Sequence, residues 1–237
     1  MIIPGIASKN NYFYPKMLKK SVFVLALLFP CFVISPRAGA IDPGTIHHRL
    51  SERVMVSMAG ERSDLPAGEI MQTALSGYEK VVEGRKLNRP EVITIIDFSL
   101  PSDRERLWVI DLIHQKVLFN CLVAHGRNSG GTVAEHFSNS PGSYASSPGF
   151  YITGETYTGK NGLSLTLDGI EKGINDKARE RAIVMHGADY VSSDFIRKNG
   201  RLGRSLGCPA VPEEFKEGII NAIKGGSCLF IYAPKAG

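Results

Sequence analysis

The chain has 237 residues, of which 43% are hydrophobic and 22% charged, and its 28 basic and 23 acidic residues give a formal net charge of +5. The first 40 residues contain no acidic residue and five basic ones, namely Lys9, Lys16, Lys19, Lys20 and Arg37. In the remainder, the other 23 basic residues balance all 23 acidic ones, so charge gives no argument for binding to nucleic acid or to a membrane surface. A remainder of about 200 residues is expected to form one domain with a substantial core.

The N-terminus has the pattern of a secretory leader. Three lysines between residues 16 and 20 precede an apolar run over residues 22–34, and Ala38-Gly39-Ala40 follows as a cleavage-site motif. A membrane-spanning helix needs about twenty apolar residues, whereas this run is shorter and contains Pro30. We therefore predict a signal peptide over residues 1–40, export of the mature chain and no transmembrane anchor after cleavage. Met17 is a second candidate start, which would make the preceding residues an upstream extension.

Three cysteines remain after the leader: Cys121, Cys208 and Cys228. An odd number leaves at least one thiol unpaired in an oxidising compartment, where an unpaired thiol is a candidate reactive group. Cys121 and Cys228 both lie in apolar runs. They are interpreted as two buried small hydrophobic residues, and a single disulfide between them is the alternative.

A helical segment is predicted over residues 41–90. Apolar side chains recur there at three- and four-residue spacing: Leu65, Ile70, Ala74, Leu75, Tyr78, Val81 and Val82. Ser63 or Asp64 is available as the N-cap, and Gly84 is expected to end the helix. The pattern is that of an amphipathic helix packed on the main body, with nothing that suggests chemistry.

Strands are predicted after Pro90. Seven runs are rich in β-branched and aromatic residues and are separated by turn-forming clusters: 92–98, 107–113, 117–124, 149–157, 163–167, 182–185 and 228–232. The short connection His114-Gln115-Lys116 predicts a hairpin between the second and third runs. Only short helices are expected between the strands, over 175–181 and 212–223, the latter closed by Gly225-Gly226. The pattern therefore predicts a mainly β domain, a sandwich or barrel, with the N-terminal helical segment and short peripheral helices.

Residues 126–149 form a long irregular stretch, with Gly, Ser or Pro at thirteen of 24 positions. Its glycines do not form a phosphate-binding loop, because the Gly-Lys-Ser/Thr ending is missing. A loop of this length within a compact domain is usually functional or disordered. We predict that it forms a lid over a substrate.

The candidate chemistry is centred on Cys208, which lies in a turn-forming stretch, Gly203-Arg204-Ser205-Leu206-Gly207-Cys208-Pro209. His186 ends an apolar strand-like run 22 positions earlier and is a candidate base that would take the thiol proton and stabilise a thiolate as an ion pair. The backbone N–H groups of Gly207 and Cys208 are candidates for an oxyanion hole. The helix predicted from Pro212 would further favour the thiolate. No acidic partner for His186 is identifiable, so a backbone carbonyl is expected to orient its ring.

Structural interpretations compete with this one. A histidine at a strand end, or a cysteine on its own, is more often structural than catalytic, and only the pair favours chemistry. Metal binding is the other alternative. His114, His125 and His136 are spaced eleven residues apart, which matches no short ligand motif, and the sequence has no Cys-x-x-Cys pair. We expect no metal site.

The motifs around the two candidates resemble those of the murein L,D-transpeptidases of the YkuD type. The resemblance spans about residues 64–234 and rests on separated motifs in the same order: 123–130, 137–139, 146–151, 175–176, 185–188 and 200–210. It implies a YkuD-like β-sandwich with the catalytic domain over residues 91–237. It also implies that Cys208 is acylated by a peptidoglycan stem peptide and that His186 is the base.

Supporting roles follow from the same resemblance. Ser205 and Gly207 would shape the oxyanion turn, with Gly187 as a further supporting residue, and Arg204, Arg127 and Ser129 are candidates for substrate binding. One departure is Leu206, since many members have histidine or arginine directly before the glycine. Substrate contacts made by that side chain elsewhere therefore do not transfer to this chain.

The sequence as a whole predicts a cysteine acyltransferase of the periplasm or cell wall that needs no metal or organic cofactor. Cys208 would attack a tetrapeptide stem, form a thioester and pass the acyl group to an amine. A carboxypeptidase or endopeptidase of the same fold remains open, as do a thiol peptidase on protein substrates and a non-catalytic wall-binding module.

Overall fold

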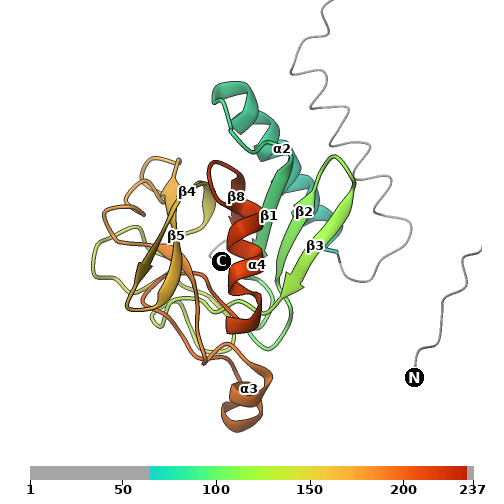
Figure 1. Ribbon diagram of the computed structural model, residues 1–237. Helices are drawn as coiled ribbons and strands as arrows, with labels where there is room; N and C mark the ends of the chain where they lie inside the picture. The colour runs from blue at the N-terminus through green and yellow to red at the C-terminus, as the bar shows by residue number, and fades with distance from the viewer. Residues whose placement is uncertain (1–64, 234–237) are drawn as a thin grey trace, which may run out of the picture. The chain divides into compact units, whose positions relative to one another are not determined.

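A computed structural model describes residues 65–233 (Figure 1). The predicted signal peptide and the candidate caps Ser63 and Asp64 lie outside these residues. The described part contains three helices, α2 (Gly68–Gly84), α3 (Ser193–Asn199) and α4 (Glu213–Ile223). The strands are β1 (Val92–Asp97), β2 (Leu107–Asp111), β3 (Lys116–Cys121), β4 (Gly149–Gly159), β5 (Gly162–Gly169), β6 (Val184–Gly187), β7 (Ala210–Val211) and β8 (Cys228–Tyr232).

The eight strands form one mixed sheet in the order β3-β2-β1-β8-β4-β5-β6-β7. The pairs β1–β8 and β6–β7 are parallel, and the other neighbours are antiparallel. The sheet curves into a nearly closed barrel or sandwich, with α4 between its β1–β3 half and its β4–β5 half (Figure 1). The predicted mainly β domain with short peripheral helices is confirmed.

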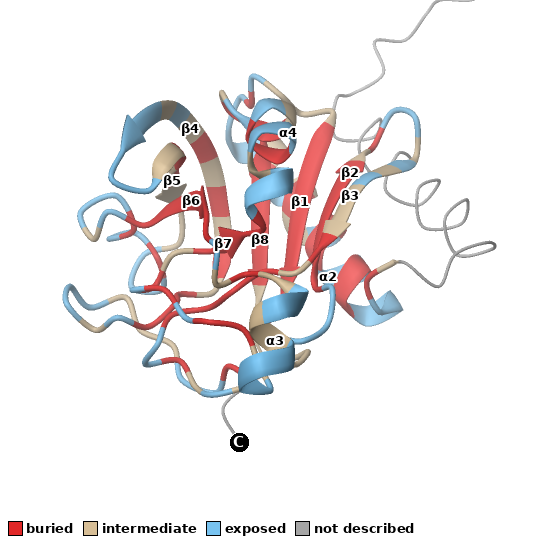
Figure 2. Ribbon diagram, turned by 60° about the horizontal axis from the view of Figure 1, so that its bottom comes forward, coloured by how far each residue is buried: buried red, intermediate tan, exposed pale blue. Residues whose placement is uncertain are grey.

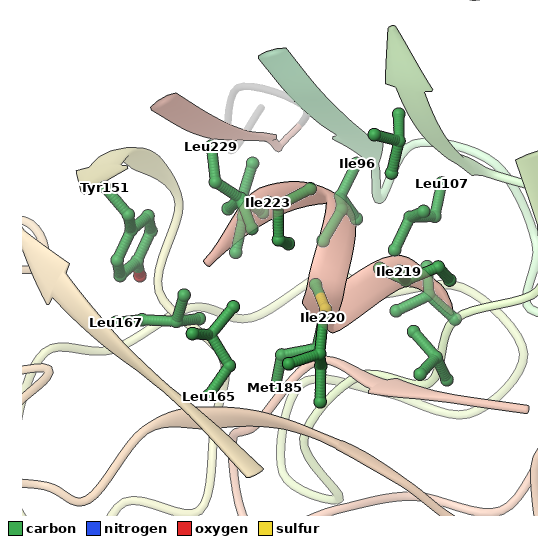
Figure 3. Packing of buried hydrophobic residues seen from close by; sticks show 14 of the residues in the cluster. Ile96, Leu107, Tyr151, Leu165, Leu167, Met185, Ile219, Ile220, Ile223 and Leu229 are labelled. Carbon is green, nitrogen blue, oxygen red and sulfur yellow. The ribbon is translucent and has the colours of Figure 1, made fainter. Parts of the chain in front are cut away.

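Helix α4 fills the concave side of this sheet. Its Ile219, Ile220 and Ile223 are fully buried and pack with residues from both halves of the sheet (Figure 3): Ile96, Leu107, Tyr151, Leu165, Leu167, Met185 and Leu229. Helix α2 packs against the other face through a second cluster that includes Ile93, Ile95 and Phe230. Both faces of the central strands are therefore covered, which explains why these strands are continuous apolar runs in the sequence.

Burial falls off along β4 (Figure 2). The first half of β4 is buried or half-buried, whereas its far end and the turn into β5 are exposed. Several of these exposed residues line the pocket described below. In the described part of the chain, no helix is long and apolar enough to cross a membrane.

The observed elements differ from the predicted ones at several points. Residues 175–181 form turns rather than a helix, because the side chain of Asn175 bonds the backbone of Glu171, Pro148 and Phe150. Strand β3 ends at Cys121, since Ala124 pairs only as an isolated bridge with Ala210. Helix α2 begins after Ala67 without a side-chain cap and ends at Gly84, as expected. The short elements α3 and β7 were not predicted.

Candidate active site

Cys208 lies in the turn that leads into β7, and its side chain lines a pocket of about 420 Å³. Strand β7 pairs with β6 in parallel, with Ala210 opposite His186, which brings the turn beside β6. The sulfur accepts a hydrogen bond from the Val184 N–H at 3.5 Å and donates to the Ala182 carbonyl at 3.7 Å. The thiol is thus fixed against the start of β6 while one side faces the pocket.

His186 lies on β6 and lines the same pocket. Its Nδ1 is 2.8 Å from the carbonyl oxygen of Gly187, so Nδ1–H is the donor and Nε2 is left to accept a proton. The ring is therefore held by a backbone carbonyl, as expected from the sequence, and the supporting role of Gly187 stays a prediction. A side chain at Gly187 would clash with Glu213 and Lys216, because its Cβ would lie 2.7 Å from an atom of each.

The two candidate residues converge on one pocket without touching. Val184 and His186 are two positions apart on β6, so their side chains share one face of the strand, and both residues line the pocket with Cys208. No hydrogen bond among the described residues joins the Cys208 sulfur to the imidazole ring. Proton transfer therefore requires a side-chain movement or a bridging group, and catalytic hydrogen bonds often form only when substrate is bound.

Burial favours the neutral forms of both groups. It raises the pKa of Cys208, and the Val184 N–H, Arg181 and Lys160 act in the opposite direction. It lowers the pKa of His186, while the bond to Gly187 and the charge of Glu213 raise it. Both directions favour a thiol and a neutral imidazole in the site without substrate, and the thiolate–imidazolium ion pair stays a prediction. Glu213 lies in the first turn of α4, and its negative charge acts on the pKa of His186.

Only one of the two backbone N–H groups predicted to bind an oxyanion is available for that purpose. The Gly207 N–H donates to Ser205 Oγ at 3.1 Å, and the Ser205 hydroxyl donates to the Cys208 carbonyl at 2.6 Å. Ser205 therefore fixes the turn, and the Gly207 N–H is not free for a substrate. Within residues 65–233, the Cys208 N–H has no protein acceptor, so of the two predicted donors it alone is left to bind an oxyanion.

The three predicted substrate-binding residues have different positions. Arg204 lines the pocket, and its Nη1 donates to the carbonyls of Gly130 and Arg127. Arg127 is exposed and is not among the lining residues of the pocket, and its guanidinium stacks on the lining residue Tyr144 with a distance of 4.2 Å to the ring centroid. Ser129 is fully buried, and its hydroxyl accepts from the Ser146 N–H. It braces the loop and cannot touch a substrate in this conformation, which corrects the prediction.

Several residues of the pocket were not predicted. Lys160 lies between the glycines that end β4 and begin β5, and Arg181 lies in the segment predicted as a helix. Tyr144 and Ala182 also line the pocket, with φ angles of 53° and 52° in a region that non-glycine residues rarely adopt. The Gly159–Gly162 hairpin signal could have placed Lys160 at a tip. No sequence signal places Arg181.

The 126–149 loop contributes Gly142 and Tyr144 to the pocket. Hydrogen bonds join it to the turn that carries Cys208. The Arg127 N–H donates to the Ser205 carbonyl, and the Ser146 hydroxyl donates to the Gly207 carbonyl. The loop thus lies against the candidate nucleophile. The proposed lid motion remains a prediction.

The other two cysteines are buried and free. Cys121 packs in the core beside α4 and Cys228 packs in the core beside α2, so they face opposite sides of the sheet. This supports their interpretation as small hydrophobic residues and excludes the alternative disulfide. Within residues 65–233, no group of three or more His, Cys, Asp or Glu side chains is placed to hold a metal ion.

Comparison with known proteins gives a family match and distant structural similarities. A sequence profile of the L,D-transpeptidase catalytic domain matches residues 64–232. The chain is similar to an L,D-transpeptidase from Mycobacterium smegmatis (10% identity, TM-score 0.38, 60% of this chain and 59% of that one). It is also similar to the helical cell shape determining protein Pgp2 from Campylobacter jejuni (11% identity, TM-score 0.41, 82% of this chain and 58% of that one). A further similar protein is an L,D-transpeptidase from Stackebrandtia nassauensis (12% identity, TM-score 0.37, 81% of this chain and 93% of that one).

This chain therefore spans less than two thirds of the first of these proteins. No curated protein matches the sequence.

Proposed function

Because the chain belongs to the L,D-transpeptidase catalytic domain family, we propose that it is an exported peptidoglycan L,D-transpeptidase that forms its acyl-enzyme on Cys208. The observation that carries the proposal is that Cys208 and His186 line one open pocket and that Nε2 of His186 is free to accept a proton. The predicted signal peptide would deliver the enzyme to the periplasm or cell wall, where peptidoglycan stem peptides are its substrates.

The proposed reaction has two transfers. His186 Nε2 takes the thiol proton as the Cys208 sulfur attacks the carbonyl of the bond that precedes the terminal D-alanine. The Cys208 N–H donates to the resulting oxyanion. The C–N bond then breaks, D-alanine leaves with the proton from His186, and a thioester remains.

The second transfer reverses these roles. An amine of another stem loses its proton to His186 and attacks the thioester, which forms the new peptide bond and returns the proton to the sulfur. Hydrolysis by water at this stage would make the protein a carboxypeptidase or endopeptidase. Neither transfer needs a metal or an organic cofactor.

The test is to replace Cys208 with alanine and to measure the protein mass after incubation with a tetrapeptide stem or a carbapenem. We expect an acyl adduct on the unaltered protein and none on Cys208→Ala. Cys121→Ala is the matched control, since that thiol is buried in the core and its loss should leave the adduct in place. An adduct that persists on Cys208→Ala would overturn the mechanism.

Product analysis separates the remaining alternatives. A cross-linked product that appears only with an acceptor amine identifies a transpeptidase, whereas trimmed or cleaved stems without an acceptor identify a hydrolase. A thiol that reacts with neither substrate nor alkylating agent would favour a wall-binding module.

A further inference from the structure

Arg181 occupies an unusual position for a charged side chain. Its guanidinium is half-buried at the edge of the pocket and donates four hydrogen bonds to the 126–149 loop. Nη1 donates to the Ser138 carbonyl at 2.7 Å and the Ser147 hydroxyl at 3.1 Å, and Nη2 donates to the Ala145 carbonyl at 2.6 Å and the Ser143 hydroxyl at 3.2 Å. One side chain therefore holds both sides of the Tyr144 turn.

All four acceptors are neutral, and Arg181 forms no salt bridge with a described residue. Its neighbour Arg179 provides the contrast, because it makes two hydrogen bonds to the Asp168 carboxylate, at 2.7 and 2.6 Å, and is exposed. These two arginines, two positions apart, therefore differ in their charge environment. The charge of Arg179 is compensated by a carboxylate, and that of Arg181 is not.

The uncompensated charge lies beside the candidate nucleophile. The residue after Arg181 accepts the hydrogen bond from the Cys208 thiol, at 3.7 Å. A Cβ at Gly207, directly before the cysteine, would lie 3.3 Å from Arg181 Nη2. Because a positive charge near a partly buried thiol stabilises its ionised form, this cation lowers the pKa of Cys208 and so opposes the effect of burial.

The other charged groups around the pocket do not cancel this effect. Its titratable side chains besides Cys208 and Arg181 are Tyr144, Tyr157, Lys160, His186, Tyr190 and Arg204, and no acidic side chain lines it. Lys160 is exposed at the hairpin tip, where water screens its charge. Arg204 is exposed as well, so Arg181 is the least exposed of the three cations that line the pocket.

We propose that Arg181 is a positioning residue of this site: it fixes the Tyr144 turn beside the nucleophile and supplies the positive charge that favours the Cys208 thiolate. This role rests on Cys208 as the nucleophile of the proposed function. The two ideas remain separable, because the reactivity of the thiol toward a small alkylating agent can be measured without any peptidoglycan substrate.

The experiment measures the rate at which iodoacetamide alkylates Cys208 as a function of pH, with peptide mass mapping to identify the modified cysteine. Arg181→Gln is expected to move the midpoint of the profile to higher pH and to slow alkylation at neutral pH by about tenfold. Arg181→Lys keeps the charge and should restore the midpoint, although it loses part of the hydrogen bonding and melts at a lower temperature.

Two further variants separate charge from loop anchoring. Ser143→Ala removes one anchor without changing charge, so it should lower the melting temperature and leave the alkylation midpoint in place. Arg179→Gln removes a compensated arginine of the same segment and should also leave the midpoint unchanged. An unchanged profile in Arg181→Gln, or a failure of Arg181→Lys to restore it, would overturn the charge role. Normal alkylation of the unaltered protein without acyl-enzyme formation would instead count against the proposed function.

Discussion

At the scale of single residues, the hydroxyl of Ser205 organises the nucleophile turn. It accepts a hydrogen bond from the Gly207 N–H and donates one to the Cys208 carbonyl, so it satisfies two backbone groups of the turn. The Ser205 side chain is buried, and no water is needed to satisfy it. Ser205 therefore helps to orient Cys208 through two hydrogen bonds within the turn, although it does not itself react.

Replacement of Ser205 with alanine should disturb this turn. We expect kcat/KM for acyl-enzyme formation to fall roughly 10- to 100-fold, because small displacements of a nucleophile are costly, and stability to fall by about 1–3 kcal/mol, because two hydrogen bonds are lost. Stopped-flow acylation and denaturant unfolding measure the two effects. Ser192→Ala is the control, since it removes the N-cap of α3 at a cost of about 1 kcal/mol and should leave acylation unchanged.

The chemistry of the residue types was enough to predict the reactive pair, whereas the roles of other pocket residues depend on tertiary contacts. Cys208 and His186 could be identified because few side chain types perform acyl transfer and both lie beside turn-forming residues. The role of Arg181 could not be identified in this way. Its partners lie 34 to 43 positions away and are two backbone carbonyls and two serine hydroxyls, which leave no pattern in the sequence.

At the scale of elements, α4 connects the two halves of the curved sheet. Its three buried isoleucines lie between strands that are not neighbours in the sheet. The helix and the long strands could be predicted from their apolar periodicity. The two-residue strand β7 and the seven-residue α3 are too short to carry a period, and Asn175 diverts its segment from the predicted helix.

Truncation of Ile220 tests the contribution of α4. Its side chain is fully buried, so Ile220→Ala should lower the free energy of unfolding by about 2–5 kcal/mol through lost burial and a residual cavity. Glu217→Ala changes an exposed residue of the same helix and should alter stability by about 0.5 kcal/mol or less. Denaturant unfolding compares them, and equal effects in both variants would show that α4 is not part of the cooperative core.

At the scale of the whole molecule, a buried Arg106–His125 pair links the sheet to the active-site loops. Arg106 is fully buried, lies over the Phe98 ring and donates to the carbonyls of Val123 and Leu100. Its Nη2 also donates to His125 Nδ1 at 2.8 Å, which requires a neutral imidazole. Burial, reinforced by the charge of Arg106, lowers the pKa of His125 from 6.5 to about 4.

This shift makes the stability of the molecule depend on pH. Between pH 6.5 and about 4, the unfolded chain binds a proton at His125 that the folded protein does not. The stabilisation is therefore complete above pH 6.5 and is lost as the pH falls toward 4, by about 3 kcal/mol in total. His125→Asn keeps an acceptor for Arg106 and cannot titrate.

Urea unfolding between pH 7 and pH 4 measures the effect. The unaltered protein should lose more stability over this range than His125→Asn, and the difference should build up mainly between pH 6 and pH 4.5. Carboxylates and His186 titrate in both proteins and cancel in the comparison. Parallel stability curves for the two proteins would mean that the imidazole is protonated in the fold and that its contact with Arg106 does not hold.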